Sequence, residues 1–87
     1  MPLENASEKM REKLEETAVF LRPLNYFWFK EMRRLAAGDG TEAWRAEIAQ
    51  AVWGRNSLAG LFISPPKERE HFALLLNELK EAFERLK

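Results

Sequence analysis

The sequence has no cysteine, and only one histidine, four glycines and four prolines stand among its 87 residues. Without cysteine the chain can form neither a disulfide framework nor a thiolate metal site. Side-chain packing, or a partner, must therefore hold the fold together, at a size where folding buries only about two thirds of the unfolded chain's surface. We expect residues 1–87 to form a single domain.

An excess of charge of one sign and long hydrophobic runs are also missing. Fourteen basic residues match fourteen acidic ones, which removes the overall field typical of dedicated nucleic-acid or anionic-membrane binders. No apolar run approaches the roughly 20 residues that a membrane span needs. Residues 1–22 are polar and acidic, unlike a signal peptide. We expect a cytoplasmic protein that does not bind membranes.

Known catalytic and metal-binding motifs are absent too. The sequence contains no HExxH, CxxC, GxGxxG or phosphate-loop pattern. His71, the one histidine, stands in no serine, cysteine or carboxylate constellation that the sequence specifies, so a solvated or capping role is favoured. We therefore expect that the protein is not an enzyme and that it uses no cofactor and no metal ion.

Helix start signals and periodicity predict a first helix from about Ala6 to Arg22. Asn5 and Glu8 have the spacing of a capping box, whose side chains bond to free N–H groups of the first turn. Beyond the box, residues at helical spacing would line one buried face. They are Met10, Leu14, Thr17, Ala18 and Leu21.

A second helix is predicted over residues 25–38, and it carries four aromatic residues in a row. Pro23 disfavours helical geometry at the residue before it, and Asn25 can cap a new start. At about 100° per residue, the run over residues 26–29 fans through roughly 300° of the helix surface, so it cannot face one side. The core face predicted from the helical wheel holds Leu24, Trp28, Phe29, Met32, Leu35 and Ala36.

Two of the four aromatic residues fall among charges on this wheel, and they admit two interpretations. Tyr26 and Phe27 lie in the first turn, where the end of the first helix or a later connector could fold over them. Alternatively, they form an exposed aromatic and basic patch with a composition favoured at protein interface hot spots. That predicted partner-binding site consists of Tyr26, Phe27, Lys30, Arg33 and Arg34.

A third helix is predicted over residues 41–53, capped by Asp39 or Thr41 and stopped by Gly54. It is apolar on two faces, so it is either central in the fold or shared between two subunits. One stripe holds Trp44, Ile48, Ala51 and Val52, and the opposite side holds Ala46, Ala49 and Trp53. The second set is the predicted seam if the protein is a homodimer, because alanines allow backbones to approach closely.

The last third of the chain predicts an apolar, partly helical connector and then a long helix. Ser57 could cap a single turn within residues 55–64, although Gly60 interrupts it. Prolines are tolerated in a first helical turn, so Pro66 marks the start of a helix over residues 66–86. Its amphipathic stripe holds Phe72, Leu75, Leu76, Leu79, Ala82, Phe83 and Leu86.

These patterns predict an all-α fold, because no segment has the alternation or the β-branched enrichment of a strand. We expect a small helical bundle of three long helices plus a short helical connector, with antiparallel neighbours because the loops are short. The predicted function is that of a non-enzymatic protein-binding module, such as an adaptor, an assembly subunit, or a small inhibitor or regulator of a larger complex.

A nucleic-acid-binding regulator is the alternative function. Residues 22–60 carry six basic and four acidic residues, so the middle of the chain is mildly positive. Tyr26 or Phe27 could stack on unpaired bases. The segment from Glu47 to Leu58 is also comparable with a helix-turn-helix, although its candidate second helix contains Gly60 and few polar residues.

Overall fold

The computed structural model describes residues 2–86, with side chains from residue 6 onward. This part of the chain contains four α-helices, one 3-10 turn and no strand, which confirms the all-α class. None of these helices has the length and apolar character required to cross a bilayer. The elements are α1 (Pro2–Leu21), α2 (Tyr26–Ala36), α3 (Glu42–Trp53), η1 (Leu58–Gly60) and α4 (Pro66–Glu84).

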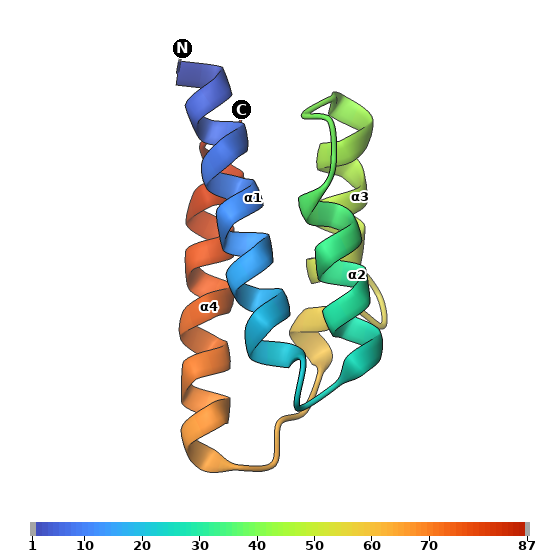
Figure 1. Cartoon of the computed structure of the whole chain (residues 1–87), viewed down its shortest axis with the longest axis vertical. Helices are drawn as coiled ribbons and strands as arrows, with labels where there is room; N and C mark the ends of the chain where they lie inside the picture. Colours follow the sequence, from blue (N-terminus) through green and yellow to red (C-terminus); the bar gives the residue numbers. More distant parts are fainter. Residues whose placement is uncertain (1, 87) are drawn as a thin grey trace.

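The helices form an elongated bundle of about 39 × 20 × 19 Å in which consecutive helices run antiparallel (Figure 1). α1 packs against both α2 and α4, and α3 packs against α2 and η1. The start of α1 and the end of α4 lie at the same end of the bundle (Figure 1). At the opposite end, the turn between α1 and α2 meets the connector that enters α4.

α1 begins earlier than its sequence signals predict. The helix starts at Pro2, so Asn5 lies inside it, and the predicted cap at Asn5 is wrong. A proline at the first position fits a helix start, because its missing N–H would have no intrahelical partner. The predicted buried face is confirmed: Met10, Leu14, Thr17, Ala18 and Leu21 are all fully buried.

Side-chain caps fix the starts of α2 and α3. Asn25 Oδ1 accepts a hydrogen bond from the Trp28 N–H at 3.1 Å, which confirms the predicted cap of α2. Thr41 Oγ1 accepts from the Trp44 N–H at 3.2 Å, so Thr41 caps α3. Asp39 instead supports this cap, because its Oδ1 accepts from both the N–H and the hydroxyl of Thr41. α2 ends at Ala36, two residues before the predicted end.

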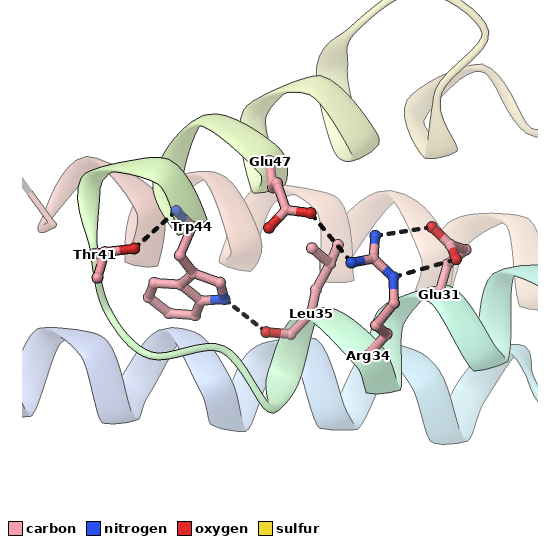
Figure 2. A network of polar contacts seen from close by, with 6 residues as sticks. All are labelled: Glu31, Arg34, Leu35, Thr41, Trp44 and Glu47. Atoms are coloured by element: carbon pink, nitrogen blue, oxygen red, sulfur yellow. Dashed lines mark hydrogen bonds and ion pairs between the residues drawn. The ribbon is translucent and has the colours of Figure 1, made fainter.

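Trp44, in the first turn of α3, contacts both α2 and α1. Figure 2 shows its hydrogen bond to Leu35 of α2. Its buried indole Nε1 donates a hydrogen bond of 2.7 Å to the carbonyl of Leu35, in the last turn of α2. From α1, the guanidinium of Arg11 lies 5.2 Å from the centre of the Trp44 ring, and its Nε donates to the carbonyl of Gly38 at 3.0 Å. A side chain at Gly38 would overlap the indole, so this close approach requires glycine.

The connector and α4 follow the predicted pattern with a small rotation of the buried stripe. Leu58 and Ile63 anchor the connector in the core, and η1 is its only helical turn. Arg69 ties the connector to α4, because its guanidinium donates to the carbonyls of Ile63 and Ser64 at 3.0 and 2.9 Å. Phe72, Leu75, Leu79, Ala82 and Leu86 are buried, whereas Leu76 and Phe83 are half-buried.

Two glycine substitutions test the close packing around Trp44. We expect Gly38→Ala to lower the free energy of unfolding by about 1 to 3 kcal/mol, because the new methyl group displaces the indole. Gly60→Ala is the matched control, since a Cβ there meets no atom within 4 Å and the backbone is not left-handed. Urea unfolding of both variants makes the comparison, and equal stabilities would contradict the packing argument.

Acid titration tests the Asp39–Thr41 cap. The Thr41 hydroxyl, and then its N–H, hold the pKa of the Asp39 carboxyl below its ordinary value. Stability from this group is therefore complete above the unfolded pKa of about 3.9 and is lost as the pH falls through the lower folded pKa. NMR titration is expected to show the lowered pKa in the wild type and a return toward the ordinary value in Thr41→Val. An unchanged pKa in the variant would remove the hydroxyl's assigned role.

Candidate partner-binding surface

The first turn of α2 exposes two large aromatic side chains. Tyr26 is 62% exposed and Phe27 is 64% exposed, so neither α1 nor the connector covers them. Trp28 and Phe29, predicted on the core face, are half-buried and pack against the core. Leu24, also predicted there, is 38% exposed, and that prediction is wrong because Leu24 lies in the turn before α2 rather than on its helical face.

Each exposed ring rests against a half-buried ring of the same helix. The Tyr26 ring centre lies 5.3 Å from that of Phe29, and the Lys30 ammonium lies 5.7 Å from the Tyr26 ring centre. Phe27 meets Trp28 edge to face at 5.3 Å. These neighbours limit the positions that the exposed rings can take. Ordering the two rings on binding would therefore cost little conformational entropy.

The five predicted residues share one exposed face of α2, and we call them the α2 surface: Tyr26, Phe27, Lys30, Arg33 and Arg34. Two of its three cations are engaged by carboxylates. Arg33 Nε lies 3.4 Å from a Glu15 oxygen on α1. Figure 2 shows Arg34 between Glu31 of α2 and Glu47 of α3, at 3.2 and 3.1 Å. Hydrogen bonds to Glu31 and then Glu47 raise the pKa of Arg34 above its ordinary value.

This pairing weakens the argument for nucleic-acid binding. Phosphate groups would have to compete with the carboxylates that already hold Arg33 and Arg34. The proposed helix-turn-helix also has no second helix, because residues 55–64 contain only the three-residue η1. A recognition helix needs several turns to place side chains along a major groove.

The predicted homodimer seam on α3 is only partly accessible. Ala46 is exposed, and Ala49 and Trp53 are half-buried. The Trp53 ring packs against Phe83 of α4 with ring centres 5.3 Å apart. On the opposite face of α3, Trp44, Ile48 and Val52 are buried as predicted, and Ala51 is half-buried. Packing within the bundle thus explains much of why α3 is apolar on two faces, and the homodimer seam stays a prediction.

The sequence did not single out Phe62, which is 74% exposed and the most exposed large apolar side chain of the described residues. The sequence does not distinguish Phe62 from Leu58 and Ile63, which are apolar residues of the same connector and are buried. His71 lies on the surface with its ring 4.7 Å from that of Phe20. No three acidic or histidine side chains among the described residues are arranged to hold a metal ion.

Comparisons of the chain with protein-family models, with curated proteins and with solved structures find no match.

The ion pairs of Arg33 and Arg34 lead to a prediction about oligonucleotides. We expect single-stranded and double-stranded DNA and RNA to show no mobility shift with the wild-type protein, even at low salt where phosphate contacts are strongest. Glu15→Gln, Glu31→Gln and Glu47→Gln together remove every carboxylate that pairs with the two guanidinium groups, and this triple variant is the comparison, expected to bind more strongly than the wild type. A wild-type shift as strong as that of the triple variant would contradict the assignment of these arginines to internal pairs.

Proposed function

We propose that this chain is a non-enzymatic protein-binding module that uses the α2 surface to contact a larger complex, as an adaptor, an assembly subunit, or a small inhibitor or regulator. The observation that carries the proposal is the adjacent pair Tyr26 and Phe27, both more than 60% exposed in the first turn of α2. Tyrosine and phenylalanine are enriched at protein interfaces, where each contributes a large contact area.

The energy available from these two rings is sufficient to matter. Full burial of a large apolar side chain contributes about 1.5 to 3 kcal/mol, and about 60% of each ring is still exposed here. Covering both therefore offers on the order of 2 to 4 kcal/mol before the costs of association. A contribution of this size is typical of an interface hot spot.

The charges around the rings also suit a protein partner. The α2 surface has paired Arg33 and Arg34 at its rim and Lys30 beside the Tyr26 ring. Rim charges that alternate in sign give specificity and orientation to a protein contact and contribute little to its affinity. Each arginine also pairs with a neighbouring helix, Arg33 with Glu15 of α1 and Arg34 with Glu47 of α3.

Replacing the two exposed rings tests the proposal. Tyr26→Ser combined with Phe27→Ser is expected to abolish capture of partner proteins from the native host by an immobilised chain, with the helical circular-dichroism spectrum unchanged. The matched control is Val19→Ser combined with Leu74→Ser, which removes two apolar side chains of similar exposure, 64% and 55%, from α1 and α4. If the folded double variant still captures every partner, the α2 surface is not the binding site.

A further inference from the structure

Exposed apolar side chains gather at one end of the bundle. Figure 1 shows that the turn between α1 and α2 and the connector before α4 meet at this end. Of the six large apolar side chains that are exposed in the described residues, four belong to these two segments and the first turn of α2. They are Leu24, Tyr26, Phe27 and Phe62. The α2 surface therefore has an apolar neighbour that belongs to other segments of the chain.

Three adjoining hollows make this end concave. Leu24 and Phe62 line one hollow, between the α1–α2 turn and residues 61–65. Leu24 also lines a second hollow, with Lys67 at the start of α4. Leu61 joins the first hollow to a third, whose walls include Trp28 and Trp53. We call these hollows together the end groove, defined by Leu24, Trp28, Trp53, Leu61, Phe62 and Lys67.

The end of the bundle that holds the end groove carries cations that lack carboxylate partners. Lys67 and Glu68 both line the hollow beside Leu24, and Arg69 lies against Phe62. In the described residues no ion pair joins Arg22, Lys30, Lys67 or Arg69 to an acidic side chain. This contrasts with Arg33 and Arg34 farther along α2. Residues 20–31 and 54–71, which build this end, hold five basic and three acidic residues. One of those three, Glu31, is engaged by Arg34.

Arg69 is a cation that the fold holds in place. Its Nε and Nη2 donate to the carbonyls of Ile63 and Ser64, and its guanidinium lies 5.1 Å from the centre of the Phe62 ring. Backbone carbonyls orient the group without neutralising its charge. A guanidinium has five N–H donors, so three remain for an incoming carboxylate beside the exposed Phe62 ring.

We propose that the end groove binds an acidic amphipathic segment of a partner protein. An apolar side chain of that segment enters the hollow between Leu24 and Phe62, and flanking carboxylates meet Lys67 and Arg69. In residues 20–31 and 54–71 five cations stand against two carboxylates outside ion pairs, Glu68 and Glu70, so charge complementarity selects an acidic partner over a basic one. This inference rests on the proposed function and adds to it the chemistry of the partner and the residues outside α2 that recognise it.

Synthetic amphipathic peptides test the inference directly. Three series carry leucine at the same helical positions, with glutamate, glutamine or lysine at all other positions, and are titrated against the full chain by fluorescence anisotropy. The glutamate series is expected to bind about tenfold more tightly than the glutamine series, with an advantage that shrinks as salt is added. The lysine series is expected not to bind. Equal binding of the series, or no binding by any of them, would overturn the proposal.

Two variants assign the binding to the end groove. Lys67→Gln is expected to weaken glutamate-peptide binding about threefold to fivefold, and Phe62→Ser is expected to weaken it about tenfold, because each removes one charged or apolar contact. Lys80→Gln and Leu74→Ser are the matched controls, exposed residues of α4 outside the groove, and are expected to bind as the wild type does. Neither test variant disturbs the backbone bonds of Arg69. Loss of binding in the controls as well would place the site elsewhere.

Further measurements distinguish other occupants of the end groove, and distinguish failure of this inference from failure of the proposed function. Stronger binding to phosphatidylserine vesicles than to the glutamate peptides would identify a membrane surface instead. Self-association in sedimentation velocity that Lys67→Gln abolishes would identify a second copy of the chain. If the Tyr26 and Phe27 double variant loses its native partners while the peptide series bind equally, only the acidic-segment inference fails. If the Tyr26 and Phe27 double variant keeps all partners, the proposed function of the α2 surface fails, whatever the peptide series show.

Discussion

The hydrogen bond from the Trp44 indole to the carbonyl of Leu35 is the constraint on which the arrangement of α2 depends. That carbonyl belongs to the last turn of α2 and also accepts the N–H of Gly38, just past the helix, at 3.0 Å. Trp44 adds a second donor from α3 at 2.7 Å, and its buried indole N–H would be costly to leave without a partner. Gly38 admits the indole and Arg11 covers it from α1, so one side chain sets how three helices meet.

With α2 held at both ends, the exposure of its aromatic rings follows from helix geometry. Asn25 sets where α2 begins, and Trp44 joins its last turn to α3. Met32 and Leu35 then face the core, and residues placed about half a turn away must face solvent. The exposure of the α2 surface therefore follows from which face of α2 packs on the core. Four consecutive aromatic residues cannot all lie on that one face.

Local signals in the sequence located the helices, apart from the early start of α1, and contacts between helices account for the features of the candidate site that these signals missed. Caps and periodicity located α2, α3 and α4 to within two residues, and the wheel separated the exposed Tyr26 and Phe27 from their half-buried neighbours. The carboxylates that hold Arg33 and Arg34 across helices lie on α1 and α3, at sequence distances that no local pattern relates. The orientation of Phe62 likewise depends on how the connector crosses the end of the bundle, since its apolar neighbours gave it the same signal as buried Leu58.

The pairing of charges, rather than their number, distinguishes the arginines of the α2 surface from Arg69 beside the end groove. The chain is neutral overall, and a basic count in its middle suggested a cationic surface. In the folded protein the arginines in the second half of α2 are engaged by carboxylates of neighbouring helices, whereas Arg69 is oriented by backbone carbonyls and has no carboxylate partner among the described residues. Exposed ion pairs of this kind add little stability, but a ligand must compete with the carboxylates for the paired cations, whereas the unpaired ones remain available to it. Lys67, which lines the end groove, and Arg69, which lies against Phe62, therefore differ from the paired arginines of α2 in having no carboxylate partner among the described residues.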